Sequence, residues 1–378
     1  MKLLFIITDL LTGGAEMMLL KLLSRIDRSL FECRVISLED LGTIGPRIGA
    51  LGIPVLEIGM QPRSLDVSRW LLLAREIHAF NPSIVQTWMY HADLLGGVAA
   101  KLAGVPCIIW NVRHSNLNPN LNKLHTRLAA RFCAGLSHWI PTRILTNSGV
   151  AAQVHQALGY DASRMLTIPN GFETDRFKPD AASRAAFRNE LGLPVDAPLI
   201  GLVGRYDRQK NHFGFLRAAE IVAQEHPAVH FVLCGRGVDA NNGQLTSRVG
   251  CNGLRERFHL LGERSDMPRV TAALDIACSS SFGEAFPNAI GEAMACGVPC
   301  VVTDVGDSAI LVGNTGRVVP PRDDCGLARA ILGLMEMPEG ERQVLGLRAR
   351  QRIIDNYSLD SVVRQYEMLY ESVVGRRI

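Results

Sequence analysis

Short apolar runs alternate with longer amphipathic stretches along the first half of the chain. The apolar runs are continuous, as in parallel strands that are buried on both faces of a sheet; they cover residues 3–7, 33–38, 84–86, 107–111 and 144–146. The longer stretches have the helical period; they cover residues 15–24, 70–80 and 93–103. This alternation predicts a doubly wound parallel sheet with helices on its faces.

The same pattern restarts in the second half of the chain. The predicted strands there cover residues 199–203, 230–234, 258–261, 276–279 and 300–303. Two such units predict an α/β protein with two Rossmann-like domains, which a length of 378 residues also favours. We place the domains at residues 1–170 and 171–357. A final amphipathic helix is predicted within residues 358–378, because Leu359, Val362 and Tyr366 begin one apolar stripe.

The composition is that of an ordinary globular protein, with 47% hydrophobic and 20% charged residues. A net charge of +3 is too small to indicate nucleic-acid binding. Residues 1–170 hold 16 Lys and Arg against 11 Asp and Glu, whereas the remainder holds 24 against 26. A basic first half suits a surface that meets anionic lipid or an anionic acceptor, although scattered solvated charges give the same count.

The cysteines and the apolar segments indicate a cytoplasmic protein. Nine cysteines without a C-x-x-C pair are typical of reduced thiols. The first apolar run stops at Thr8, which is too soon for a secretory signal. No segment offers about 20 clean apolar residues, so we expect no transmembrane helix. The basic first half allows a peripheral position at the inner face of the cytoplasmic membrane.

Two glutamates separated by seven residues give the strongest chemical signal. Glu284 lies in a predicted loop, and Glu292 lies in the short helix that Pro287 begins and Gly297 ends. Carboxylates accept hydrogen bonds from the vicinal hydroxyls of a sugar or ribose. The free N–H groups at the helix start attract an anion such as a diphosphate. Together these groups match the needs of a nucleotide sugar, whereas either glutamate alone could be a solvated acid.

Basic residues follow the first predicted strand of the second half. Gly204 allows close backbone approach to a ligand, and Arg205 and Lys210 could neutralise a diphosphate. Ligands in open α/β sheets bind at strand ends, which favours a binding role for this loop over simple solvation.

Two further strand ends carry candidate residues. Gly13 and Gly14 form a turn that opens a helix, without the G-x-G-x-x-G or G-K-[ST] spacing of dinucleotide or P-loop sites. His114 follows another strand and could bond a sugar hydroxyl or a phosphate; His91 is a weaker candidate. We find no Asp-x-Asp and no H-x-x-x-H set, so the sequence predicts no metal site.

Taken together, these residues resemble the large family of retaining GT-B glycosyltransferases whose mark is two glutamates separated by seven residues. The resemblance covers nearly the whole chain. It rests on Glu284 with Glu292 and on four weaker segments, residues 13–16, 113–115, 169–177 and 204–210. Ala285 departs from the pattern, because many relatives carry glycine there.

The resemblance implies a fold and a role for each candidate residue. It implies two Rossmann-like domains facing a central cleft, with the last helix crossing back to the first, acceptor-side domain. Glu284 would hold the donor sugar and Glu292 the ribose, while Arg205 and Lys210 would bind the diphosphate. His114 would sit by the donor sugar. The remaining donor-binding residues would be Gly13, Gly14, Gly204, Arg264, Phe286, Pro287, Asn288 and Ala289.

The resemblance also implies the reaction. A sugar would pass with retention from a UDP- or GDP-sugar to a lipid-linked or glycan acceptor in surface polysaccharide synthesis, without a metal or cofactor. A nucleotide-sugar epimerase or a phosphorylase could share the architecture, but Lys178 and Lys210 are the only lysines after residue 170 that could serve a phosphorylase cofactor. A non-catalytic nucleotide-sugar-binding subunit is a third alternative.

Overall fold

The computed structural model describes residues 1–61, 66–115, 124–249 and 254–375. The chain divides into two compact units. Unit 1 comprises Met1–Gly171 together with Leu359–Ile378, and unit 2 comprises Phe172–Ser358. The sequence analysis placed the domain boundaries after residues 170 and 357; the acceptor and donor roles of the two domains stay predictions.

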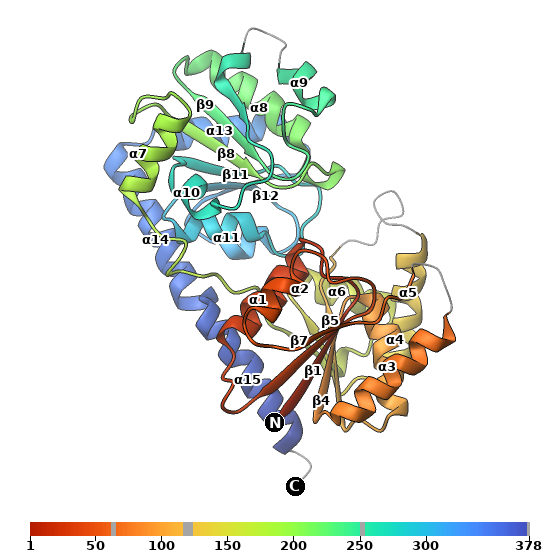
Figure 1. The fold of residues 1–378 in the computed structure, drawn as a ribbon. Coiled ribbons are helices and arrows are strands. Elements are labelled where there is room, and N and C mark those ends of the chain that lie inside the picture. Colours follow the sequence, from red (N-terminus) through yellow and green to blue (C-terminus); the bar gives the residue numbers. More distant parts are fainter. Residues whose placement is uncertain (62–65, 116–123, 250–253, 376–378) are drawn as a thin grey trace. The chain divides into compact units, whose positions relative to one another are not determined.

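Unit 1 is built on a seven-stranded parallel sheet in the order β3-β2-β1-β4-β5-β6-β7 (Figure 1). Its elements are β1 (Lys2–Ile7), α1 (Gly14–Arg25), β2 (Glu32–Ser37), α2 (Gly45–Gly49), β3 (Val55–Glu57), α3 (Val67–Phe80), β4 (Ile84–Trp88), α4 (Tyr90–Leu102), β5 (Cys107–Val112), α5 (Leu124–Leu136), β6 (Arg143–Thr146), α6 (Gly149–Leu158), β7 (Met165–Thr167) and α15 (Leu359–Gly375).

Successive side chains of β1 point to opposite faces of this sheet and fill two cores. Leu3, Phe5 and Ile7 pack with α1 and α15 on one face. Leu4 and Ile6 pack with α3, α4 and α5 on the other. The strands therefore need apolar residues at every position, which explains the continuous apolar runs in the sequence.

Unit 2 is built on a six-stranded parallel sheet in the order β10-β9-β8-β11-β12-β13. Its elements are α7 (Ala181–Glu190), β8 (Leu199–Val203), α8 (His212–Glu225), β9 (His230–Cys234), α9 (Gly243–Val249), β10 (Phe258–Leu260), α10 (Met267–Ala272), β11 (Ile276–Ser279), α11 (Asn288–Ala295), β12 (Cys300–Thr303), α12 (Ser308–Val312), β13 (Arg317–Val319), α13 (Asp324–Met335) and α14 (Glu339–Tyr357). Helices α8 and α13 cover one face, and α11 and α14 cover the other.

The apolar runs of the sequence predicted the central strands of both sheets but not three edge strands. β3, β7 and β13 are three residues long and lie at sheet edges. Their side chains are mostly half-buried or exposed, so they form no continuous apolar run. The predicted helix over residues 70–80 in fact begins at Val67, because the Asp66 side chain accepts hydrogen bonds from Ser68 N and Arg69 N.

The C-terminal helix α15 completes unit 1. It lies at the blue end of the chain beside the red helix α1 (Figure 1). Tyr366 and Tyr370 on its apolar stripe are fully buried, and Tyr370 Oη donates to Gln86 Oε1 on β4 at 2.5 Å. Among the helices that the structure describes, none combines the length and hydropathy needed to cross a membrane.

Candidate functional site

Two loops of unit 2 come together at the carboxyl ends of neighbouring strands β8 and β11. The first covers residues 204–211 and the second covers residues 280–287. Phe282 N donates to Gln209 O at 2.7 Å, and Asn211 Nδ2 donates to Ser280 O at 3.1 Å. The Ser280 hydroxyl donates back to Lys210 O at 3.0 Å. These bonds hold Lys210 and Glu284 in one pocket although 74 positions separate them in the sequence.

Lys210 and Glu284 form an ion pair, with Lys210 Nζ 2.5 Å from Glu284 Oε1. The Ser281 hydroxyl donates to the same carboxylate oxygen at 2.7 Å. The Glu284 side chain is 11% exposed and that of Lys210 is 27% exposed. The two side chains thus reach the pocket while their charges stay largely shielded from water. This shielding strengthens the charge-assisted hydrogen bond between them.

The loop that carries Glu284 rests on Gly306, a contact that the sequence analysis missed. Gly306 has φ +56°, and a Cβ placed there would lie 2.0 Å from Glu284 O. Asp307 N donates to Ala285 O at 3.1 Å. The Thr303 hydroxyl donates to Ser281 O at 2.7 Å. Glycine is therefore required at position 306 for sterics and backbone conformation alike.

Helix α11 begins directly after this loop. Pro287 occupies the N-cap, where its missing N–H costs nothing, and its side chain makes no capping bond. Pro287, Asn288 and Ala289 line the pocket of Lys210 and Glu284. Glu292 lies half-buried in the middle of this helix and outside that lining. The helix start and Glu284 are thus together, as the sequence predicts, and the role of Glu292 stays a prediction.

Two predicted donor-binding residues have side chains engaged elsewhere. The Phe286 ring is 6% exposed and stacks at 6.1 Å on Phe172, so only its backbone remains for a ligand. The Arg264 guanidinium pairs at 2.7 Å with Glu190 and with Asp266. The hydrogen bonds from Arg264 lower the pKa of Asp266 to about 2. We therefore predict that Phe286 and Arg264 contact a donor through their main chains.

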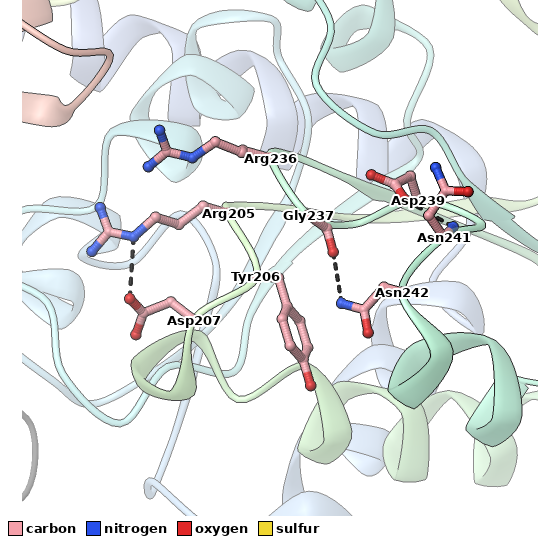
Figure 2. A pocket seen from close by; sticks show the side chains of 8 residues that line it. All are labelled: Arg205, Tyr206, Asp207, Arg236, Gly237, Asp239, Asn241 and Asn242. Carbon is pink, nitrogen blue, oxygen red and sulfur yellow. Dashed lines mark hydrogen bonds and ion pairs between the residues drawn. The ribbon is translucent and has the colours of Figure 1, made fainter.

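Arg205 lies in a different hollow from Lys210. Its side chain is 51% exposed, and its Nε lies 3.2 Å from Asp207 Oδ2. With Tyr206 and Arg236 it lines an open hollow of about 510 Å³ between the loops that follow β8 and β9 (Figure 2). Gly204 precedes it after the end of β8, where an added Cβ would lie 3.5 Å from the Lys210 side chain. The sequence analysis treated Arg205 and Lys210 as one basic pair and overlooked Arg236.

In unit 1, the glycine turn follows β1 as predicted. Gly13 is the N-cap of α1, and Gly14 is the first residue of the helix. Glu16 folds back so that a Cβ at Gly13 would lie 2.3 Å from Glu16 Oε2. The turn therefore leaves no room for a larger residue at position 13 unless Glu16 moves.

His114 follows β5 and packs on Tyr90, with ring centroids 5.7 Å apart and planes 27° apart. Tyr90 Oη lies 2.6 Å from His155 Nε2, and His155 Nδ1 lies 2.7 Å from Ala151 O. Because a carbonyl only accepts, Nδ1 carries the proton and Tyr90 donates to Nε2. Burial lowers the pKa of His155 to about 4, which keeps its ring neutral. This support of His114 by Tyr90 and His155 was not predicted from the sequence.

Two segments that carry the family resemblance, residues 113–115 and 169–177, contact each other in unit 1. Arg113 is buried, donates to Asn170 Oδ1, and lies 4.9 Å above the Trp88 ring. Desolvation lowers the pKa of Arg113 below its ordinary value. His91, the weaker histidine candidate, faces His125 with ring centroids 5.7 Å apart. Within the described ranges, no group of three or more His, Cys, Asp or Glu side chains could hold a metal ion.

Comparison with known proteins identifies the family. A family model for glycosyl transferases group 1 matches residues 197–337, and one for glycosyltransferase family 4 matches residues 12–176. Two curated relatives differ in their activities and in the share of this chain that they match. An Escherichia coli UDP-Gal:α-D-GlcNAc-diphosphoundecaprenol α-1,3-galactosyltransferase is 26% identical over 82% of this chain and 79% of its own length. A D-inositol 3-phosphate glycosyltransferase of Corynebacterium jeikeium is 31% identical over 57% of this chain and 54% of its own length.

Solved structures share the fold over almost the entire chain. Anabaena HepE in complex with UDP superimposes with a TM-score of 0.87 at 22% identity, covering 98% of this chain and 100% of that one. WaaG, a glycosyltransferase involved in lipopolysaccharide biosynthesis, gives a TM-score of 0.75 at 15% identity, covering 99% and 100%. The two family models, the relatives and the shared architecture together show that the chain belongs to the GT-B-fold glycosyltransferases of group 1 and family 4.

Proposed function

We propose that this protein transfers a sugar from a UDP-sugar to a diphosphate-lipid-linked glycan, with retention at the anomeric carbon; a GDP-sugar is the alternative donor. The observation that carries the proposal is the pocket in which Lys210 and Glu284 face the start of α11. A cation, a carboxylate and the positive end of a helix dipole are what a diphosphate and a neighbouring sugar need. The printed name of the Escherichia coli relative and the UDP complex of HepE support the choice of donor and acceptor.

The chemistry follows from the charges in this pocket. The bond between the anomeric carbon and the diphosphate oxygen breaks, and the acceptor hydroxyl attacks from the same face. This same-face attack retains the anomeric configuration without a carboxylate nucleophile, and a phosphate oxygen of the leaving diphosphate takes the acceptor proton. Lys210 and the start of α11 stabilise the negative charge that develops on the diphosphate. Glu284 orients the hydroxyls of the sugar being transferred, and Glu292 holds the ribose.

The test is transfer by the purified full-length protein. UDP-galactose, UDP-glucose, UDP-GlcNAc and GDP-mannose would each be offered with GlcNAc-diphosphoundecaprenol or a shorter-chain analogue. We expect UDP release that depends on the acceptor, and a product whose new linkage is α by the anomeric coupling constant. An inverted linkage would refute retention. Release of nucleotide without transfer to any lipid or glycan acceptor would refute the acceptor class.

We propose that the reaction needs neither a metal ion nor a cofactor, because Lys210, Arg205 and the α11 start supply the positive charge that the diphosphate requires. Turnover is expected to be unchanged by EDTA and by subsequent addition of Mg²⁺ or Mn²⁺. Loss of turnover with EDTA and its recovery with Mg²⁺ would overturn this part of the proposal and leave the transfer itself intact.

A lipid-linked acceptor requires access to a membrane surface, and helix α5 supplies a suitable face. Leu124, Leu128 and Phe132 recur every four residues on this helix and are 66%, 43% and 64% exposed. Arg131 is exposed on the same helix, and Trp139 beyond it is 75% exposed. An apolar stripe flanked by basic residues is typical of helices that lie in the interface of an anionic membrane.

The basic first half of the chain also suggested a membrane role for Arg63, Arg69, Trp70, Arg75, Lys123 and Arg127, and not all of these residues contribute to this face. Trp70 is partly buried against the core of unit 1, and Arg69 Nη1 donates to Ile58 O at 2.9 Å. Arg75 is exposed on α3, and Arg127 is half-buried on α5. Arg63 and Lys123 lie outside the described residues. The membrane proposal therefore rests on α5 and Trp139 more than on α3.

Liposome sedimentation tests this surface. Binding to vesicles of anionic phospholipid should exceed binding to zwitterionic vesicles and weaken as salt rises. Phe132→Ser should release much of the protein. Leu347→Ser is the control, because Leu347 is 59% exposed on α14 of the other unit. If both variants sediment with the vesicles to the same extent as the wild type, the proposal that α5 binds the membrane is refuted.

A further inference from the structure

Helix α4 begins directly after β4, because Met89 alone makes the turn between them. Met89 has φ +77° and ψ +156°, a backbone conformation that is nearly restricted to glycine and that is found most often at functional sites. Its N–H donates to Asn111 O at 3.1 Å, and its carbonyl accepts from Asp93 N at 2.8 Å. These bonds hold the strained turn, which places His91 at the carboxyl end of the sheet, where ligands of α/β proteins bind.

A second histidine faces His91 from the neighbouring helix. Helices α4 and α5 pack against each other in unit 1 (Figure 1). The ring centroids of His91 and His125 are 5.7 Å apart, and both residues are half-buried. Over the part of the chain that the structure describes, neither ring forms a hydrogen bond or has a carboxylate within ion-pairing distance. Their ring nitrogens reach solvent, so both rings are open to a ligand.

The surroundings of the two rings favour an anion. Burial, and after it the proximity of His125, lowers the pKa of His91, which keeps the ring neutral at physiological pH. A phosphate group accepts a hydrogen bond from each ring and offsets their mutual repulsion when they are protonated. Burial raises the pKa of Asp93 on the same helix well above its ordinary value, so this residue adds no negative charge that opposes an anion.

The pair lies between the predicted donor-sugar residue and the proposed membrane face. On one side His114 stacks on Tyr90, which precedes His91 in α4. On the other side Leu124, the first residue of the exposed apolar stripe of α5, precedes His125. A lipid-linked acceptor presents its groups in the same order. Its reacting hydroxyl must reach the donor sugar, its diphosphate lies beyond the acceptor sugar, and its lipid follows.

We propose that His91 and His125 bind the diphosphate of the lipid-linked acceptor. The inference rests on the proposed function for the identity of that acceptor, and it places the acceptor diphosphate in unit 1, apart from the Lys210–Glu284 pocket proposed for the donor. A phosphate could also come from the headgroup of a membrane phospholipid. The chemistry of recognition would be the same, so the experiment must separate these two sources.

Isothermal titration calorimetry of the full-length protein, with saturating UDP to fill the donor site, tests the pair without turnover. The probes are farnesyl diphosphate and dihexanoyl phosphatidylglycerol. His91→Gln and His125→Gln should each weaken farnesyl diphosphate binding about tenfold, because a hydrogen bond to a charged group is lost. His78→Gln is the matched control, since His78 is an exposed histidine on α3 of the same unit. Equal urea midpoints would show that the variants are folded.

Steady-state kinetics extends the test to the reaction. Both site variants should raise the acceptor KM about tenfold and leave the donor KM unchanged, because they contact only the acceptor. His78→Gln should change neither constant.

The outcomes distinguish the site from the proposed function. The proposal is overturned if UDP abolishes farnesyl diphosphate binding to the wild type, or if both variants bind it normally. A loss confined to phosphatidylglycerol would assign the pair to membrane headgroups and overturn it too. Histidine-dependent farnesyl diphosphate binding in a protein that transfers no sugar would support the site and refute the proposed function. Transfer to a diphosphate lipid with a normal acceptor KM in both variants would do the reverse.

Discussion

Lys210 Nζ donates to Glu284 Oε1 at 2.5 Å, and this bond joins the loop after β8 to the loop after β11. Because the two charges are paired, replacing either residue changes the electrostatic environment of the other. An uncompensated, largely buried carboxylate is costly, so removal of Lys210 exposes Glu284 to that cost. Kinetic effects of the two residues should therefore be coupled.

Lys210→Ala is expected to lower kcat by about 10²–10³, because Lys210 faces charge that grows in the transition state. Glu284→Gln should affect kcat and donor KM together, whereas Glu292→Gln should mainly raise donor KM. The measurement is steady-state kinetics at saturating acceptor, with the Lys210→Ala/Glu284→Gln double variant. We expect the double variant to lose less than the product of the two single losses. A near-normal kcat for Lys210→Ala would remove Lys210 from the mechanism.

Gly306→Ala should damage the site by displacing Glu284. The new Cβ would meet Glu284 O at 2.0 Å, so the loop must shift. Gly104→Ala is the control, because Gly104 also has positive φ and nothing within 4 Å of its Cβ position. Both variants should lose about 1 kcal/mol from backbone strain. Gly306→Ala alone should also raise donor KM or lower kcat by about tenfold. Equal kinetics in the two variants would contradict the support of Glu284 by Gly306.

Gly291→Ala should destabilise unit 2 through the packing of α11. A Cβ at Gly291 would lie 2.0 Å from Phe172 Cζ, against the face of that ring. We expect a loss of about 1–3 kcal/mol in the free energy of unfolding. Gly333→Ala in α13 meets nothing within 4 Å and should gain up to about 1 kcal/mol from helix propensity. Urea denaturation followed by circular dichroism compares them; the opposite order of stability would refute the contact.

His155 should make stability depend on pH. Its folded pKa is about 4, whereas an unfolded histidine has a pKa near its ordinary 6.5. Between these values only the unfolded chain binds the proton, so stability is lost as the pH falls from about 6.5 towards 4. The urea midpoint should drop between pH 7 and pH 5, and drop less in His155→Gln. Buried His212 and half-buried His259 also have pKa values lowered to about 4, so the wild type and the variant must be compared directly. Parallel pH profiles would exclude a contribution from His155.

The sequence predicted those parts of the fold that continuous apolar runs determine. Central strands such as β8 and β11 are buried on both faces and therefore stand out. Edge strands such as β13 are three residues long and half exposed, so tertiary pairing defines them more than composition does. Helix boundaries were shifted by local capping, as at Asp66.

The candidate site was predictable where its residues follow strands or form a compact motif. Glu284, Lys210 and the α11 start meet these conditions, and the structure places them in one pocket. Gly306 and His155 do not, because each acts through a contact that has no local signature in the sequence. Arg236 is an ordinary exposed arginine in the sequence, and only the pairing of β8 with β9 sets it beside Arg205.

Unit 1 is discontinuous, since α15 is separated from residues 1–171 by the whole of unit 2. A ribosome synthesises α15 only after residues 1–171 and the whole of unit 2, so the nascent chain carries residues 1–171 while the apolar surface that receives Tyr366 and Tyr370 is still uncovered. Unit 2 is continuous and can complete its core while α15 is still being made. Residues 1–171 therefore precede unit 2 in synthesis but complete their core after it, and until α15 has been made their uncovered apolar surface favours aggregation during translation.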